Sequence, residues 1–187
     1  MRNWKALGLC VAALALPVAT PAQAEVTHVS DQGFAVLHAV KINAPPEKVW
    51  ATLIAPQSYW SSSHSWSGDA TNMYLDPQAG GCFCEKIPAK TVEGSSLNSV
   101  EHMRVIYSER PRILRMSGAL GPLQSEGAIG TMNVAMEADG TGTKISMSYV
   151  VGGFLRIKPQ DIAPAVDGVI GEQLLRLKAR AEGRDPL

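Results

Sequence analysis

Two neighbouring stretches of alternating residues constrain the fold of this chain more than any other feature. In residues 128–137, the apolar Met132, Val134 and Met136 alternate with smaller or polar side chains, and residues 143–151 repeat the pattern. A period of two is that of a β-strand with one covered face and one solvent-facing face. The turn sequence of residues 139–142, Asp-Gly-Thr-Gly, lies between the stretches. The two strands are therefore predicted to pair as an antiparallel hairpin.

Five further strands and two helices are predicted along the chain. The strands cover residues 34–42, 70–75, 82–87, 100–107 and 113–117. A short helix opens after Asn43 or Ala44 and ends at Pro56, and a long helix runs from about Pro159 to Glu182. The apolar face of the long helix consists of Ile162, Val166, Val169, Ile170, Leu174 and Leu177. This order predicts an α+β domain with a curved antiparallel sheet wrapped on the C-terminal helix, and it leaves the polar residues 25–32 without an element.

The first 24 residues have the pattern of a secretory signal peptide. Arg2 and Lys5 precede an apolar run over residues 6–19, and Ala22-Gln23-Ala24 is a small-x-small cleavage sequence. The run is short for a bilayer span, although an uncleaved N-terminal anchor is the alternative. We therefore expect residues 1–24 to be removed and residues 25–187 to form a single domain that is exported, most simply to a bacterial periplasm.

The charge of the remaining chain argues against a nucleic-acid partner. The full sequence holds 17 basic and 17 acidic residues, and removing Arg2 and Lys5 leaves 15 against 17, a net charge of −2. Phosphate binding needs clustered Lys and Arg, and no basic run is present. A second long apolar segment is also missing from the sequence, so no stable membrane insertion is expected after signal cleavage.

Four phrases of the sequence, taken in order, resemble the START-like or SRPBCC superfamily of helix-grip proteins, specifically its polyketide cyclase/dehydrase-like branch. They are VKINAPPEKVWATL (residues 40–53), LDPQAGGCFCE (75–85), EHMRVIYSERPRILRMSG (101–118) and DIAPAVDGVIGEQLLRLKARAE (161–182). The resemblance implies a seven-stranded sheet that grips the C-terminal helix, with an elongated hydrophobic cavity between them for lipids, polyketides or similar compounds. It implies a pocket but no particular reaction, because the superfamily shares no catalytic motif.

The segment Gly80-Gly81-Cys82-Phe83-Cys84 raises the question of a metal clamp or a redox pair. The resemblance places the glycines at a hairpin tip and the cysteines on a strand, where positions i and i+2 share a face. Two thiols at that spacing lie at the edge of disulfide reach, and they supply only two soft ligands for a metal such as Cu(I). The pattern favours ordinary packing, with a strained or intermolecular disulfide and a metal site as the alternatives. We predict no metal site and no cofactor.

The predicted cavity wall draws on both the sheet and the helix. Aromatic residues Trp60 and Trp66 lie in a serine-rich loop that is expected at one end of the cavity. Methionine side chains adapt to irregular ligands, but on an inner sheet face they also serve as plain core filling. The complete set of predicted lining residues is Trp60, Trp66, Met116, Met132, Met136, Met147, Tyr149, Ile162, Val166 and Ile170.

Two residues are candidates for acid–base chemistry. His64 lies between the loop tryptophans and Glu126 follows an irregular segment that is a candidate lid. For each, a solvent-exposed loop residue is the simpler interpretation. His38 is interpreted as a buried, hydrogen-bonded histidine, and the neighbours Glu101 and His102 should point to opposite faces of their strand.

Two functions remain from different classes. The favoured one is binding of a small hydrophobic molecule in the cavity, for which burial alone supplies affinity. The alternative is an enzyme of the polyketide cyclase, dehydratase or hydrolase kind with acid–base groups in the same cavity. An enzyme should bring two titratable groups to one side of the pocket, whereas a binder should keep polar groups at its mouth. The sequence leaves the oligomeric state open.

Overall fold

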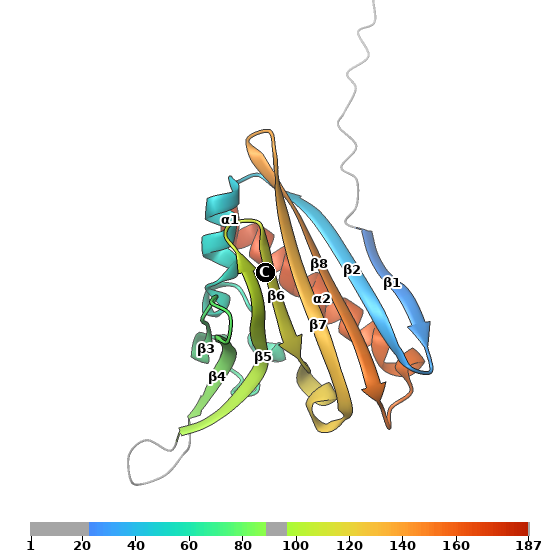
Figure 1. The fold of residues 1–187 in the computed structure, drawn as a ribbon. Coiled ribbons are helices and arrows are strands. Elements are labelled where there is room, and N and C mark those ends of the chain that lie inside the picture. Colours follow the sequence, from blue (N-terminus) through green and yellow to red (C-terminus); the bar gives the residue numbers. More distant parts are fainter. Residues whose placement is uncertain (1–22, 89–96, 187) are drawn as a thin grey trace, which may run out of the picture.

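An open eight-stranded antiparallel sheet folded around one long helix forms this protein, in a computed structural model that describes residues 23–88 and 97–186 (Figure 1). The elements are β1 (Gln23–Ser30), β2 (Gly33–Ile42), α1 (Pro46–Leu53), β3 (Met73–Leu75), β4 (Cys82–Pro88), β5 (Leu97–Glu109), β6 (Ile113–Gly118), β7 (Gly127–Asp139), β8 (Gly142–Phe154) and α2 (Pro159–Ala181). Short 3-10 helices η1 (Pro56–Ser58), η2 (Ser62–His64) and η3 (Ala70–Asn72) precede β3, and η4 (Gly121–Ser125) follows β6. The strand order is β1-β2-β8-β7-β6-β5-β4-β3.

The alternating hairpin predicted from the sequence is present. Strands β7 and β8 pair antiparallel from Gly127 opposite Phe154 to Asp139 opposite Gly142. On the covered face, Met132, Val134 and Met136 are buried, as are Met147 and Tyr149 across the pair. The α+β helix-grip architecture predicted from the sequence is confirmed.

The predicted count of seven strands is wrong, because the sheet has eight strands within the described residues. The additional strand is β1, in a region that the sequence left without an element. It pairs with β2 through backbone groups, for example Val26 opposite Val36 and Val29 opposite Phe34. Side-chain polarity does not oppose such pairing at a sheet edge, where the ladder is made by main-chain groups and one face stays wet. Val26 nevertheless packs against the core, and β1 also contacts α2.

Two predicted segments differ in extent from what the structure describes. The strand expected over residues 70–75 is a strand only at Met73–Leu75, since η3 occupies its first half. The predicted signal peptide, residues 1–24, falls outside the described residues up to position 22, and its cleavage after Ala24 stays a prediction. Across the parts of the chain that the structure describes, no helix combines the length and apolar character that a membrane span requires.

Helix α2 lies on the inner face of the sheet and closes the core (Figure 1). Pro159 occupies its first turn, where the missing N–H costs no hydrogen bond. Gly183, with φ of 78°, allows the chain to turn left-handed just beyond its last turn. Its buried apolar side chains include Ile170, Leu174 and Leu177, which pack against the sheet core. Helix α1 contacts α2 as well, and buries Val49, Trp50 and Leu53.

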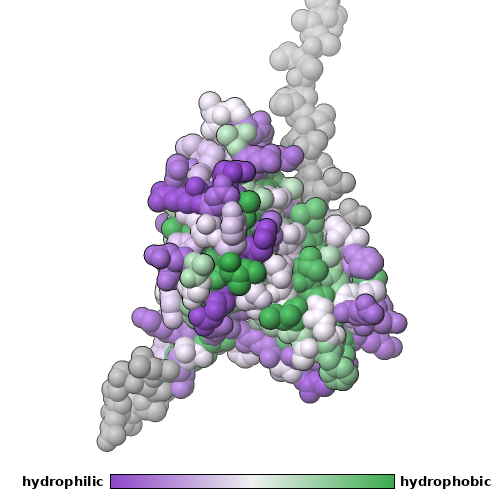
Figure 2. All heavy atoms as spheres, in the orientation of Figure 1, coloured by the Kyte–Doolittle hydropathy of each residue, from purple (hydrophilic) through white to green (hydrophobic). Residues whose placement is uncertain are grey.

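The opposite face of the sheet is a mixed surface. Figure 2 shows hydrophilic residues interrupted by separate hydrophobic areas on this side of the molecule. The exposed apolar side chains of the central strands include Leu37 of β2, Ile129 of β7 and Val150 of β8. The sheet therefore keeps the one-sided burial that the alternation predicts.

Candidate functional site

A buried carboxylate in β4 is the starting point of the site. The Glu85 side chain is 0% exposed, on the same face of the strand as Phe83. Its Oε1 accepts a hydrogen bond from the backbone N–H of Ser67 at 2.6 Å, and its Oε2 accepts one from the N–H of Trp66 at 3.0 Å. The Nε2 of His102 lies 3.1 Å from the same Oε2. Three donors thus replace the water that this carboxylate has lost.

Those donors also decide the charge of Glu85. Burial raises its pKa, but the hydrogen bonds from Ser67, Trp66 and His102 outweigh burial and hold the pKa below its ordinary value. Glu85 is therefore an anion at neutral pH. The anion holds the 66–67 backbone on the sheet. Both residues belong to the serine-rich segment of residues 58–67 that carries Trp60 and Trp66, hereafter the aromatic loop.

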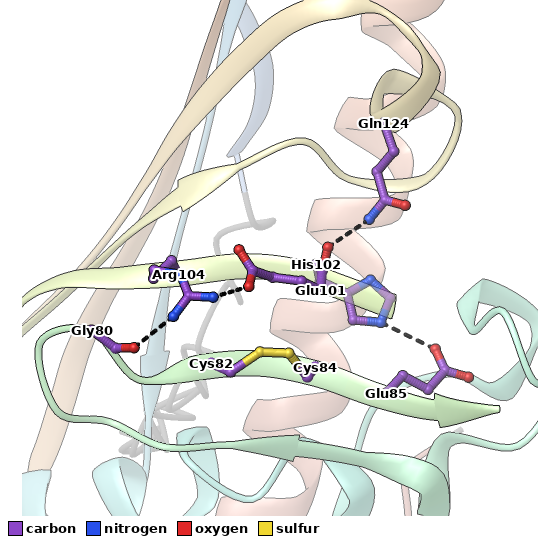
Figure 3. The surroundings of a disulfide bond; sticks show 8 residues. All are labelled: Gly80, Cys82, Cys84, Glu85, Glu101, His102, Arg104 and Gln124. Atoms are coloured by element: carbon purple, nitrogen blue, oxygen red, sulfur yellow. Dashed lines mark hydrogen bonds and ion pairs between the residues drawn. A yellow bond between two sulfur atoms is a disulfide. The ribbon is translucent and has the colours of Figure 1, made fainter. Parts of the chain in front are cut away.

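A β-bulge places His102 beside Glu85 (Figure 3). Met103 is opposite Phe83 and Glu101 is opposite Cys84, so His102 is an extra residue without a partner in β4. Strict alternation from buried Met103 and exposed Arg104 would put His102 on the solvent face. The bulge reorients the strand, and the His102 side chain is only 4% exposed.

The burial of His102 controls its protonation. Its ring lies against Phe83, with 5.1 Å between the ring centroids. Burial lowers the pKa of His102, and this effect exceeds the opposing influence of Glu85. The imidazole is therefore neutral at neutral pH and carries one proton.

The aromatic loop is held by the sheet on one side and by α2 on the other. Trp60 packs edge-on against Phe83, with ring centroids 5.3 Å apart, and its Nε1 donates to the carbonyl of His64 at 3.0 Å. On the other side, the N–H of Ser61 donates to Oε1 of Gln173 at 2.9 Å. This loop is therefore an ordered wall.

A second histidine–carboxylate pair lies at the edge of the same region. The Nε2 of His64 is 3.0 Å from Oε2 of Glu172 on α2. Both side chains are partly exposed, at 33% and 41%. This pair connects the loop to the helix in contact with solvent.

Tyr149 holds the backbone ahead of η4, on the side of this region opposite the aromatic loop. Its hydroxyl donates to the carbonyl of Gly118 at 3.1 Å and accepts from the N–H of Leu120 at 3.2 Å. Burial raises the pKa of Tyr149 to about 12, so the hydroxyl stays protonated. A Cβ on Gly130 would lie 2.2 Å from the Tyr149 ring, so a glycine is needed there. These contacts hold the chain that leads into η4.

A pocket of about 500 Å³ opens between these walls. That volume suits a small organic molecule. The aromatic loop, η4 and one face of α2 form most of the lining, and His102 contributes from the sheet. The lining residues are Trp60, Ser63, His64, Ser65, Trp66, His102, Leu120, Gly121, Pro122, Ile162, Ala165, Val166, Val169 and Ile170.

The structure brings together part of the predicted site. The predicted residues that line the pocket are Trp60, His64, Trp66, Ile162, Val166 and Ile170. The predicted residues Met116, Met132, Met136, Met147 and Tyr149 are buried in the core and do not line it. Glu126 is also away from the pocket lining, where both of its carboxylate oxygens accept from the Arg156 side chain. The Arg156 side chain holds the pKa of Glu126 below its ordinary value.

Sequence reasoning missed the Glu85 and His102 pair. An available signal was the carboxylate itself, since Glu85 shares a strand face with the apolar Phe83 and Ile87. No such signal exists for the bulge at His102. The prediction that Glu101 and His102 point to opposite faces agrees with their exposure, because Glu101 is exposed and His102 is buried.

The structure joins Cys82 and Cys84 in a disulfide, whereas the sequence pattern favoured plain packing (Figure 3). Their Cα atoms are 5.4 Å apart. The two sulfur atoms and a carboxylate oxygen of Glu101 lie within 4.8 Å of one another. As long as the sulfurs are bonded to each other, neither is a thiolate ligand, and Glu101 pairs with Arg104.

An antiparallel sheet gripping a C-terminal helix, with an apolar pocket beside that helix, defines a helix-grip protein of the ligand-binding kind. Residues 33–182 match the family described as polyketide cyclase / dehydrase and lipid transport, and the chain belongs to this family. No curated protein matches the sequence.

Several solved structures share the fold. An uncharacterized protein from Rhizobium leguminosarum is 20% identical, with a TM-score of 0.54 over 80% of this chain and 96% of that one. A protein from Mesorhizobium loti is 16% identical, with a TM-score of 0.53 over 81% and 98%. CalU16 from Micromonospora echinospora is 15% identical, with a TM-score of 0.51 over 82% and 77%. At these identities the likeness shows the fold alone.

Proposed function

We propose that this protein binds a small hydrophobic molecule in the pocket between α2, the aromatic loop and η4. The observation that carries the proposal is the pocket itself, which encloses about 500 Å³ and is lined mainly by aliphatic and aromatic side chains. Burial of apolar ligand surface contributes roughly 25 cal/mol per Å² before the costs of association. The lipid transport named in the family's description supports the same function.

A substitution that fills the pocket tests the proposal. Val166 lines the pocket from α2, so Val166→Trp should occupy its volume. Binding of the apolar fluorescent probe N-phenyl-1-naphthylamine should weaken at least about tenfold, because the buried contact area is lost. The matched control is Leu175→Trp, since Leu175 is exposed on the same helix and does not line the pocket. Equal probe binding by the Val166 variant and the wild type would refute the pocket as the binding site, provided that circular dichroism shows both to be folded.

An acid–base enzyme is the second candidate function, and the observation in its favour is the presence of two histidines in the pocket lining. His64 and His102 each pair with a carboxylate, Glu172 and Glu85 respectively. Glu126 lies outside the lining, so the acid–base role passes to the histidines. Native mass spectrometry of protein from its own cells, followed by incubation of any bound compound with fresh protein, distinguishes the two functions. A ligand that is retained unchanged supports binding, and a ligand converted to product supports an enzyme.

We also propose that the protein is exported after removal of residues 1–24. The sequence pattern of the leader supports this, and the Cys82–Cys84 disulfide is consistent with an oxidising compartment. The intact mass of protein isolated from a bacterial periplasm should correspond to a chain that starts at Glu25. A chain that retains Met1 would contradict the proposed cleavage.

A further inference from the structure

We infer that His102, oriented by Glu85, is the hydrogen-bond acceptor of the pocket, and that the ligand is an apolar molecule whose hydroxyl group, a phenol, enol or alcohol, donates to Nδ1 of His102. This inference rests on the proposed binding function and names the chemical class of its ligand. It assigns a polar recognition site to a residue pair that lies on β4 and β5, where the aromatic loop is anchored to the sheet.

The contact with Glu85 fixes the tautomer of His102. Glu85 is an anion that already accepts two backbone N–H bonds, and an anionic carboxylate cannot donate. The contact of 3.1 Å between Nε2 of His102 and Oε2 of Glu85 therefore requires the proton on Nε2. In a neutral ring this leaves Nδ1 with a lone pair, as an acceptor.

The position of Nδ1 leaves this nitrogen within reach of a ligand. His102 lines the pocket, and Figure 3 shows the Nδ1 edge of its ring turned away from Glu85, toward the side of Gln124 in η4. Among the described residues no hydrogen bond reaches Nδ1. In the part of the chain that the structure describes, the fully buried polar side-chain atom without a hydrogen-bond partner is Nε2 of Gln173. Nδ1 of His102 is not such an atom, so it is unpaired but still accessible. A ligand in the pocket can therefore reach it.

The other polar groups in the pocket lining differ from Nδ1 of His102 in their hydrogen bonding. The Ser63 hydroxyl is hydrogen-bonded to the Ser61 hydroxyl, and the Ser65 hydroxyl donates to the carbonyl of Ser62. Trp60 Nε1 donates to the carbonyl of His64. These groups are already paired, and His64, which also lines the pocket, has a side chain 33% exposed to water. The acceptor at His102 is buried and open. A buried unpaired acceptor gains most from a ligand that supplies a donor.

An acceptor at Nδ1 makes the pocket selective for ligands that donate a hydrogen bond. An oxygen that carries only lone pairs would face the Nδ1 lone pair and leave both unpaired, and an anionic ligand would also be repelled by the Glu85 charge. A hydroxyl satisfies Nδ1. If it is acidic, its proton can move to Nδ1, which leaves the ligand oxygen negative and the imidazolium stabilised by Glu85. The same geometry therefore serves a binder and, for an acidic ligand, a general base.

Two matched compounds test this assignment by calorimetry. 2-Naphthol and 2-methoxynaphthalene share the apolar ring system, but only the first has a hydroxyl donor. The wild type should bind 2-naphthol roughly tenfold more tightly, and His102→Phe should lose this preference while still binding the ether. Equal binding of both by the wild type, or a preference that survives in His102→Phe, would overturn the inference while leaving the proposed function intact. Binding of neither compound would overturn the proposed function and the inference together.

The role of Glu85 as a positioning residue has its own test. Imidazole ¹⁵N resonances of the wild type should show Nε2 protonated and Nδ1 unprotonated, a measurement that needs no variant. The opposite tautomer would overturn the inference. Glu85→Gln should disturb this tautomer and reduce the preference for 2-naphthol. The matched control is Glu101→Gln, a nearby exposed carboxylate on β5 that should change neither. If both variants behave alike, Glu85 does not position His102.

Discussion

Two of the histidine–carboxylate pairs in the described part of the chain have nearly equal N–O distances but very different surroundings. His64 and Glu172 are 3.0 Å apart with side chains 33% and 41% exposed, whereas His102 and Glu85 are 3.1 Å apart with side chains 4% and 0% exposed. The first pair joins a loop to a helix surface, and the second is enclosed between two strands and the aromatic loop.

The difference shows that environment, and not contact distance, determines what such a pair contributes. Water and ions screen the exposed pair, which should be worth about 0–1 kcal/mol. The buried carboxylate has lost its water and depends on three protein donors, so removing it has consequences for every donor. In the buried pair, burial lowers the pKa of His102 and the Glu85 anion holds the ring proton on Nε2.

The largest effect should follow from removing the buried carboxylate. Glu85→Ala leaves the N–H groups of Trp66 and Ser67 and the Nε2 of His102 without their partner. We expect a loss of about 3–5 kcal/mol in the free energy of unfolding, measured by urea denaturation.

The control for this loss is Glu101→Ala on the neighbouring strand. Glu101 is exposed and pairs with Arg104, so its removal should cost about 1 kcal/mol or less. If both variants lose the same stability, the burial of Glu85 does not have the energetic importance that the comparison assigns to it.

A smaller effect is expected from the protonation of His102. Its pKa lies below the ordinary 6.5 in the folded state, so the unfolded chain binds a proton first as the pH falls. The stability that wild type has over His102→Phe should therefore be complete above about pH 7.5 and should decrease toward about pH 5. The pKa of Glu85 is lowered by its hydrogen bonds, so its own contribution to stability is lost mainly as the pH falls to its ordinary value of 4.5 and below.

Urea unfolding of both proteins across this pH range provides the measurement. The sign is fixed by the lowered pKa of His102. A stability difference that grows as the pH falls would mean that the folded state binds the proton more tightly, and would contradict the neutral imidazole.

The smallest effect should come from the exposed pair. Glu172→Gln should change the free energy of unfolding by about 1 kcal/mol or less, and the change should shrink further at high salt because the charges are screened. Denaturation at low and high ionic strength measures both quantities. A loss as large as that of Glu85→Ala would remove the contrast between the two pairs.

Much of the fold followed from the sequence, because alternation and turn residues are local signals. The β7–β8 hairpin and the C-terminal helix were predicted on such patterns and are present. Strand β1 was missed because its pairing depends on backbone groups, which leave no mark on side-chain pattern.

The site was less predictable, because its key residues are brought together by non-local geometry. The α2 residues Ile162, Val166 and Ile170 were found through helical periodicity and line the pocket. The methionines shared the same inner face, but periodicity cannot tell a packed stretch of that face from a hollow one. The inward orientation of His102 depends on a bulge. A bulge is a feature of the pairing between two strands, so neither strand's sequence alone predicts it.

That bulge has a consequence for the shape of the sheet. Strand β5 carries one residue more than β4 across the pair at His102, and one more than β6 across a second irregularity at Ile106. On the β4 side, the Cys82–Cys84 bond spans Cα atoms 5.4 Å apart, where two extended residues would cover about 6.6 Å. The neighbouring strands therefore run side by side with different numbers of residues, which bends the sheet. The extra residue that turns a histidine inward is thus also part of the curvature that gives this end of the sheet its concave form.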